Sequence, residues 1–244
     1  ILVPMDTPGI TLLRPMQALG DVDAPKGHFE IVFENCRVPF ENVILGEGRG
    51  FEISQGRLGP GRIHHCMRMI GQSERCLAAM CERVKNRTVF GRKLSRFDNV
   101  MNDVAQMRAK IEMCRLLVHK AADNMDHLGN KDPATRQLLS MVKAHVPKTV
   151  GEIVDQCMQA HGAKGLSQDT PLFTAWSSTR TLRMADGPDE VHWRTAGRIE
   201  LQMQDSNPLR KYGEYKVNRS QVWRRSTDPI SDKTKKILED YSRL

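Results

Sequence analysis

The spacing of hydrophobic residues changes near residue 50 of this chain. Before that point, Phe29, Ile31 and Phe33 alternate with polar residues, which is typical of a half-buried β-strand, and Pro39 ends the run. After it, apolar residues recur every three or four positions, as on one face of an amphipathic helix. The sequence therefore predicts a β-like segment over residues 1–50, followed by helices.

A glycine-rich loop marks this change of period. The stretch LGEGRGF places Gly46, Gly48 and Gly50 ahead of the first predicted helix. Their spacing matches neither the P-loop nor the dinucleotide-binding fingerprint. We therefore interpret the loop as a flexible crossover from strand to helix rather than as a phosphate site.

Three apolar stripes predict three long helices of roughly 25 to 30 residues each. In chain order, the stripes are Ile63, Met67, Ile70, Leu77 and Val84; Val100, Val104, Met107, Ile111, Cys114, Val118 and Met125; and Leu139, Val142, Val146, Val150, Ile153, Cys157 and Ala160. Pro147 lies inside the third helix and predicts a kink. Turns at 127–133 and 161–171 precede shorter helices at about 171–185 and 189–203, so the segment predicts a four-helix-type bundle.

The composition agrees with a mostly α protein and argues against two other classes. Aromatic residues make up 5% of the chain and 13 residues are methionine, a mixture that suits helices packed on helices. No apolar run approaches the roughly 18 to 20 residues that a membrane span needs. The net charge of +8 is scattered rather than arranged in a stripe, which argues against a nucleic-acid-binding protein.

Six cysteines and one pair of adjacent histidines show no metal-ligand spacing. Most of the cysteines fall on apolar helix faces, so we expect reduced core thiols in a reducing compartment. His64 and His65 point to different sides of a helix because they are neighbours. We expect one of them to be buried and the other to lie on the polar face.

The stretch RMADGPDEVHWRTAG, residues 183–197, interrupts the last helical segment and raises the question of what Asp186 does. The residues alone favour an Asp that N-caps a helix begun by Pro188. The alternative is a carboxylate displayed at a helix junction, where it can accept a proton. Asp189 and Glu190 are the rival carboxylates in the same stretch.

Four segments, in this order and spacing, resemble the C-terminal part of the acyl-CoA dehydrogenase family. They are FENCRVPFENVILGEGRGFEI, LGPGRIHHCMRMIGQSERCLAAMCERVKNRTVFGRKL, QAHGAKGLSQDTPL and LRMADGPDEVH. The resemblance covers residues 1 to about 203 and is greatest to family members ten and eleven. It implies a C-terminal helical bundle (51–203) preceded by the remnant of the middle β-domain (1–50), with a polar tail at 204–244.

The resemblance implies an enzyme that converts an acyl-CoA thioester to a trans-2-enoyl-CoA in fatty-acid β-oxidation, with FAD as cofactor. Asp186 falls at the position of the catalytic base, which removes the α-proton. Most of the family has Glu there, and Asp is one methylene shorter, roughly 1.5 Å less reach. Arg62 matches an arginine beside the acyl-CoA channel; it either pairs with a CoA phosphate or holds the start of its helix.

The resemblance also implies a set of FAD-binding residues. Arg87 and Phe90 match residues that reach FAD across a subunit interface, although a solvated arginine at a helix end remains the alternative for Arg87. The other members are Gln159, Gly162 and Ala163 at the adenosine part of FAD, and Pro188 and Glu190 near its flavin. Two positions depart from the family: Ala163 replaces a frequent Gly, and Asp98 replaces a frequent Gln.

The expected partners are an acyl-CoA substrate, an electron-transfer flavoprotein as electron acceptor, and further copies of the chain in a homodimer or homotetramer. The alternatives are a non-catalytic oligomerisation bundle and a peroxisomal acyl-CoA oxidase. The final Ser242-Arg243-Leu244 resembles a peroxisomal address, with the mitochondrion as the other location. Because the chain starts at ILVPMDTPGI without an initiator Met, we expect a fragment with weak or absent FAD binding and negligible activity on its own.

Overall fold

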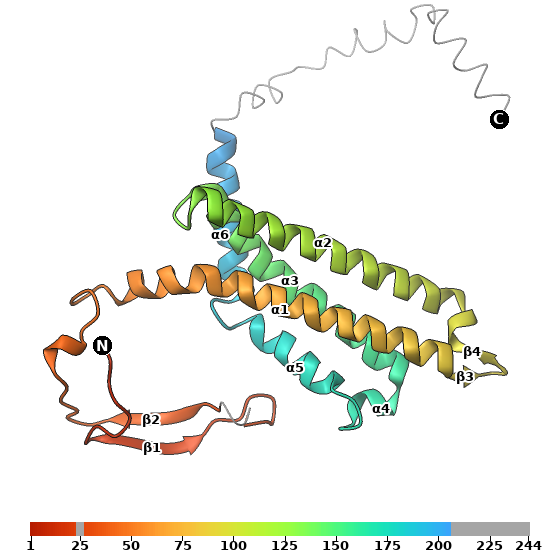
Figure 1. Cartoon of the computed structure of the whole chain (residues 1–244), viewed down its shortest axis with the longest axis horizontal. Helices are drawn as coiled ribbons and strands as arrows, with labels where there is room; N and C mark the ends of the chain where they lie inside the picture. The colour runs from red at the N-terminus through yellow and green to blue at the C-terminus, as the bar shows by residue number, and fades with distance from the viewer. Residues whose placement is uncertain (23–26, 206–244) are drawn as a thin grey trace, which may run out of the picture. The chain divides into compact units, whose positions relative to one another are not determined.

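The computed structural model describes residues 1–22 and 27–205. Residues 206–244 of the predicted polar tail, with its Ser242-Arg243-Leu244 end, lie outside the described residues, while residues 204 and 205 belong to the last helix. Contacts divide the chain after Glu200 into two compact units. Within the described residues the fold is mostly α, as the sequence predicts (Figure 1).

Two antiparallel strands, β1 (Ile10–Pro15) and β2 (Phe29–Phe33), form the described sheet of the N-terminal segment, and a short 3-10 turn follows at Phe40–Asn42. The strand at residues 29–33 is confirmed, but its predicted buried face is wrong. Phe29 and Phe33 remain 48% and 55% exposed. A hairpin of two strands has too little surface to bury a face by itself.

Three long helices lie side by side and form the bundle (Figure 1). They are α1 (Gly50–Asn86), α2 (Asp98–Leu128) and α3 (Pro133–His161). Between α1 and α2 the chain makes a small hairpin, β3 (Thr88–Val89) and β4 (Arg92–Lys93), and a 3-10 turn (Leu94–Arg96). The shorter helices are α4 (Ala163–Leu166), α5 (Leu172–Leu182) and α6 (Asp189–Asp205). Because α5 packs on α3 and α1, the predicted four-helix-type bundle is confirmed.

Local chemistry explains where α2 and α3 end and begin. Gly129, at φ +81°, ends α2 in a backbone conformation that side chains disfavour. The Asp132 carboxylate then accepts hydrogen bonds from the N–H groups of Ala134 and Thr135, and Pro133 fills the first position of α3. The turn predicted at 127–133 is therefore confirmed.

The first helix begins earlier than its apolar stripe suggests. It starts at Gly50, so this glycine belongs to the helix and not to the loop, and it runs through Pro60. The sequence places the first helix directly after residue 50, and Pro60 is a local obstacle to it, since a proline inside a helix removes one backbone hydrogen bond. Tertiary packing compensates: a Cβ at Gly59 would lie 2.5 Å from Asn130 Oδ1, so α1 closely approaches the α2–α3 turn.

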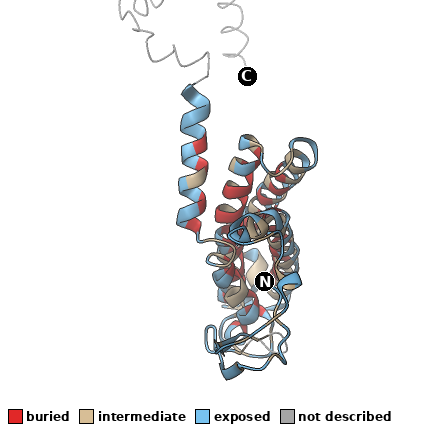
Figure 2. Cartoon of the chain, turned by 90° about the vertical axis from the view of Figure 1, so that its left-hand side faces the viewer, coloured by how far each residue is buried: buried red, intermediate tan, exposed pale blue. Residues whose placement is uncertain are grey.

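The bundle core contains the predicted stripes and most of the cysteines. Figure 2 shows buried residues along the facing sides of the helices. Four cysteines are buried, and all six are unpaired thiols: Cys36, Cys66, Cys76, Cys81, Cys114 and Cys157. Lys143 of α3 is also fully buried among apolar residues. None of the described helices has the length and hydropathy that a membrane crossing requires.

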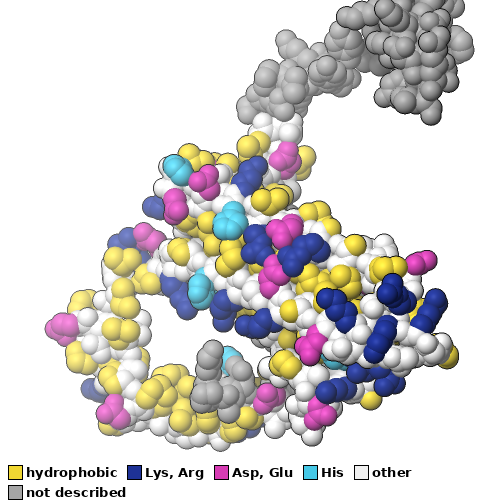
Figure 3. Space-filling view, turned by 45° about the vertical axis from the view of Figure 1, so that its right-hand side comes forward, with side chains coloured by type: hydrophobic (Ala, Val, Ile, Leu, Met, Phe, Trp, Pro, Cys, Tyr) yellow, Lys and Arg dark blue, Asp and Glu magenta, His cyan; other side chains and the backbone are white. Residues whose placement is uncertain are grey.

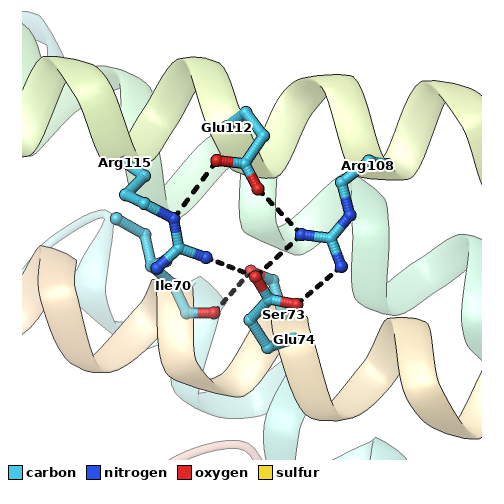
Figure 4. Close-up of polar contacts among 6 residues, drawn as sticks. All are labelled: Ile70, Ser73, Glu74, Arg108, Glu112 and Arg115. Atoms are coloured by element: carbon cyan, nitrogen blue, oxygen red, sulfur yellow. Dashed lines mark hydrogen bonds and ion pairs between the residues drawn. The ribbon is translucent and has the colours of Figure 1, made fainter.

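Ion pairs on the surface tie α1 to α2 (Figure 4). Arg108 of α2 donates to both carboxylate oxygens of Glu74 on α1, each at 2.9 Å, and Arg115 contacts the same carboxylate. Glu112 completes the network by accepting from Arg108 and pairing with Arg115. The Arg108 guanidinium holds the pKa of the Glu74 carboxyl below its ordinary range.

Candidate active site

Asp186 lies in the short junction between α5 and α6 and belongs to neither helix. Its backbone φ is +58° and that of Gly187 is +105°, so two successive residues have positive φ angles. Asp is one of the few side chains that tolerates such a conformation. The helix α6 then begins at Asp189, where the last helix is predicted to start.

Three side chains from three helices hold this junction through its carbonyl oxygens. Arg62 Nε of α1 donates to the Asp186 carbonyl at 3.1 Å, and His192 Nε2 of α6 lies 3.1 Å from the same oxygen. Lys143 Nζ of α3 donates to the Gly187 carbonyl at 2.9 Å. These contacts stabilise a strained backbone that would otherwise relax.

The Asp186 carboxylate faces α1. His65 Nε2 lies 3.2 Å from Asp186 Oδ2, and the Arg68 guanidinium contacts Nδ1 on the other side of the imidazole ring. Oδ2 is buried and makes no hydrogen bond of regular geometry within the described residues. His65 is therefore the polar contact that the structure gives this oxygen. The absence of a side chain at Gly61 leaves room beside it, since a Cβ there would lie 3.8 Å from Oδ2.

The N-cap interpretation of Asp186 is wrong, and the rival carboxylates are otherwise engaged or exposed. Among the described residues, no backbone N–H of α6 bonds to the Asp186 carboxylate; the N–H of His192 bonds to the carbonyl of Pro188 instead. Asp189 is buried and pairs with Arg183 Nε at 2.6 Å. Glu190 is exposed on α6.

Burial weakens the protonated form of the bases around the junction. It lowers the pKa of Lys143, whereas Asp189, Cys66 and Asp186 act in the opposite direction. Burial likewise lowers the pKa of His192 and of His65, against the raising effect of Asp186. Both imidazoles are therefore neutral near pH 7.

Sequence reasoning missed Lys143, His192 and the role of His65. Lys143 did carry a signal, because it lies four residues after Leu139 and three before Val146, on the apolar stripe of α3. A lysine on such a stripe needs an internal partner. The histidine pair was half correct: His64 is exposed, but His65 is half-buried against Asp186 rather than in the core.

Arg62 does not hold the start of its helix, because α1 begins at Gly50. Its guanidinium is half-buried and bonded to the Asp186 carbonyl, and burial lowers its pKa despite the nearby Asp186 carboxylate. A contact from Arg62 to a CoA phosphate stays a prediction. What the structure shows is a side chain that positions the junction.

The predicted adenosine-side and cross-subunit residues lie at the other end of α1 and α3. Arg87 caps the C-terminus of α1 and Phe90, 98% exposed, follows in the β3–β4 hairpin. Gln159 and Gly162 lie at the C-terminal end of α3 and Ala163 begins α4. Arg83 donates to the carbonyls of Ala160 and His161 and so joins the two helix ends.

The two groups of predicted residues are far apart within one chain. Arg62 and Arg87 are separated by a helical segment about 37 Å long, at 1.5 Å per residue. Pro188 and Glu190 are both exposed, and they lie near Asp186 because they follow it closely in the sequence. The structure therefore brings Pro188, Glu190 and Arg62 to Asp186, and it does not bring the five residues of the other end there.

Comparisons with known proteins agree with this arrangement. The family model "Acyl-CoA dehydrogenase, C-terminal domain" matches residues 48–201. Mouse acyl-CoA dehydrogenase family member 10 is 53% identical over 84% of this chain, and rat family member 11 is 52% identical over 84%. The chain belongs to the acyl-CoA dehydrogenase family. The predicted resemblance, including the nearness to members ten and eleven, is confirmed.

The same fold occurs in a solved Mycobacterium abscessus chain assigned to the acyl-CoA dehydrogenases, with a TM-score of 0.79 and 45% identity over 82% of this chain. The chain spans half or less of these relatives: 19% of the mouse protein, 26% of the rat protein and 49% of the mycobacterial one. The comparisons therefore assign the helical bundle of this chain to the C-terminal domain of the family.

The residues at the far end of this acyl-CoA dehydrogenase bundle fit the diphosphate and adenine of FAD. Within the described residues the Arg87 guanidinium has no hydrogen bond or ion pair, and the Phe90 ring is almost fully exposed. Exposed basic side chains gather over this end of the molecule (Figure 3); they are Lys85, Arg87, Arg92, Lys93 and Arg96. Permanent positive charge with an uncovered aromatic ring suits a nucleotide diphosphate.

The two departures from the family have local explanations. Ala163 is exposed at the start of α4, where its methyl group lies outside the core. Asp98 is the first residue of α2, where a carboxylate is favoured by the positive end of the helix dipole. Asp98 therefore has a structural role whether or not it approaches a cofactor.

Proposed function

We propose that this chain is the C-terminal part of an FAD-dependent acyl-CoA dehydrogenase in which Asp186 removes the α-proton of an acyl-CoA thioester. The observation that carries the proposal is the Asp186 junction itself. A carboxylate is held at a left-handed residue between two helices by bonds from Arg62, Lys143 and His192 to the backbone beside it. Family membership supports the same assignment.

The geometry supports a base because the carboxylate of Asp186 is held in place but is not paired with a lysine or arginine within the described residues. Its side chain is 15% exposed, and within the described residues no lysine or arginine forms an ion pair with it; its one close basic contact is neutral His65. Asp189, by contrast, is bound to Arg183. A base needs a reachable oxygen within about 3 Å of the proton that it removes. Of the three carboxylates of the junction, Asp189 is bound to Arg183 and Glu190 is exposed, so Asp186 is the partly buried carboxylate that no cation neutralises within the described residues.

FAD, when bound, supplies the acceptor for the β-hydrogen as hydride. Arg87, Phe90, Gln159, Gly162 and Ala163 would hold its adenosine and diphosphate part, and Pro188 and Glu190 would approach its flavin. Since about 37 Å of helix separates Arg62 at the junction from Arg87, the proposal includes a homodimer or homotetramer in which two copies contribute to one FAD. An electron-transfer flavoprotein is the proposed electron acceptor.

The test is Asp186→Asn in the intact, FAD-loaded enzyme, with enoyl-CoA formation as the readout. Loss of a general base lowers the rate about 10²- to 10⁴-fold. Asp126→Asn, at an exposed carboxylate on α2, is the matched control and should retain full activity. An Asp186→Asn enzyme with retained FAD and undiminished turnover would exclude Asp186 as the base.

Two further measurements separate the alternatives. An intact wild-type protein that forms no enoyl-CoA would favour the non-catalytic bundle, and oxygen consumption with acyl-CoA would favour an oxidase. For the 244-residue chain by itself, we propose little or no retained FAD and negligible turnover, and visible absorbance after desalting tests this. A peroxisomal location through Ser242-Arg243-Leu244, with the mitochondrion as the alternative, and a role in β-oxidation remain part of the proposal.

A further inference from the structure

The contact between His65 and Asp186 adds a residue to the proposed site. It joins α1 to the α5–α6 junction across more than a hundred residues of sequence. The two side chains are 25% and 15% exposed, and Nε2 and Oδ2 lie 3.2 Å apart. Oδ2 is buried, and within the described residues it accepts no hydrogen bond of regular geometry, so the His65 contact is the nearest polar one that it has.

The second ring nitrogen determines which way the hydrogen points. Nδ1 of His65 contacts the guanidinium of Arg68, three residues further along α1. An arginine can only donate, so Nδ1 must accept. The proton of the neutral ring is then on Nε2, where it faces Oδ2 of Asp186. Nε2–H of His65 is therefore a side-chain donor 3.2 Å from Oδ2, although the contact does not have regular hydrogen-bond geometry in this structure.

The same arrangement excludes His65 as the acceptor of the proton that Asp186 removes. Nε2 already carries hydrogen, and a second proton would have to enter at Nδ1, against a permanently charged guanidinium. Burial, Arg68, His64 and Lys143 all lower the pKa of His65, while only Asp186 raises it. These four residues are the titratable groups that face the ring from α1, α3 and the junction.

We infer that His65 is a positioning residue: its Nε2–H, 3.2 Å from Asp186 Oδ2, closes to a hydrogen bond with that oxygen in the substrate complex and so leaves Oδ1 to meet the substrate proton. This inference rests on the proposed role of Asp186 as the base. It explains how a side chain one methylene shorter than the family's usual Glu is aimed. The hydrogen bonds of Arg62 and His192 to the Asp186 carbonyl hold the backbone of this residue in place. His65 then orients the carboxylate at the other end of the side chain.

The first test is histidine NMR of the ¹⁵N-labelled 244-residue chain, with the His65 signals assigned through His65→Gln. We expect the Nε2–H tautomer, a lower His65 pKa in Asp186→Asn, and a higher His65 pKa in Arg68→Gln. The opposite signs follow from removing an anion and a cation that face the same ring. An Nδ1–H tautomer, or a His65 pKa that Asp186→Asn leaves unchanged, overturns the inference independently of any activity.

The second test is kinetic and uses the intact, FAD-loaded enzyme. His65→Leu removes the donor and is expected to lower kcat about tenfold to a hundredfold, the range for losing one hydrogen bond to a charged group. His65→Gln keeps a side-chain N–H and should recover part of that loss. His64→Gln, at the exposed neighbouring position, is the matched control and should behave as wild type.

The outcomes distinguish this inference from the proposed function. Equal losses in His65→Leu and His65→Gln, with His64→Gln active, would overturn the donor role. If the NMR shifts appear as expected but Asp186→Asn keeps full turnover, the contact stands as a structural one. In that case the assignment of Asp186 as the base, and with it the positioning role, is wrong.

Discussion

Substituting Gly187 by Ala tests the geometry of the junction most directly. Gly187 has φ +105°, and a Cβ built there would lie 2.8 Å from His192 Nε2. The backbone strain of a non-glycine residue at positive φ costs roughly 1–2 kcal/mol. His192 must also move and lose its contact with the Asp186 carbonyl, at about 1 kcal/mol for a hydrogen bond. We therefore expect Gly187→Ala to lower the free energy of unfolding by roughly 2–3 kcal/mol.

The matched control is Gly129→Ala at the end of α2. Gly129 has a similar positive φ of +81°, but nothing lies within 4 Å of its added Cβ. It should lose only its own backbone strain, of order 1–3 kcal/mol at φ +81° and ψ 170°. Urea denaturation followed by far-UV circular dichroism gives both free energies of unfolding on the same chain.

The contribution of His192 can then be isolated with a double-mutant cycle. In a His192→Ala background the clash has no partner, so Gly187→Ala should cost only its strain, about 1 kcal/mol less than in wild type. Additive effects of Gly187→Ala and His192→Ala would refute the reasoning, because they would mean that the two residues do not touch.

Three further predictions concern the bundle. Ile111→Ala, at a fully buried position, should cost about 2–5 kcal/mol, whereas Leu116→Ala on the same helix, 68% exposed, should cost less than about 0.5 kcal/mol in urea denaturation. Glu74→Gln should lower the free energy of unfolding by less than about 1 kcal/mol because the side chain is partly exposed. Since the pKa of Glu74 is lowered in the native state, the difference in free energy of unfolding between the variant and wild type should be present at neutral pH and vanish in acid. Burial raises the pKa of Cys66 to about 12, so iodoacetamide at pH 8 should alkylate it more slowly than Cys36, as peptide mass spectrometry would show.

The long helices were predictable because their apolar stripes are local and regular. Residues three or four apart report a common helix face whatever lies opposite, and Asp132-Pro133 and Gly129 carry their capping chemistry in the sequence. The first turns of α1, before the apolar stripe that begins at Ile63, carry no such periodic signal. Pro60 argues locally against a helix, and the packing of Gly59 against Asn130, from a different part of the chain, overrides it.

The junction was only partly predictable, for a similar reason. The family resemblance identified Asp186, whereas the residues alone favoured an N-cap that the structure does not show. His65 and Lys143 reach the junction from α1 and α3, and no sequence period connects them to Asp186. Lys143 could have been suspected, since a lysine on an apolar stripe implies a buried acceptor. The backbone carbonyl of Gly187 that serves as this acceptor could not.

Because the two groups of predicted residues lie far apart in the chain, substitutions in one group should have different effects from substitutions in the other. A motif search treats Arg87 and Asp186 as members of one site, although about 37 Å of helix lies between Arg62, at the junction, and Arg87. A substitution at Arg87 should therefore weaken FAD retention while leaving the His65 titration unchanged. Asp186→Asn should do the reverse. Only the structure separates these effects, because it shows that the Asp186 carboxylate is held by His65 while Arg87 has no contact with the junction within the described residues.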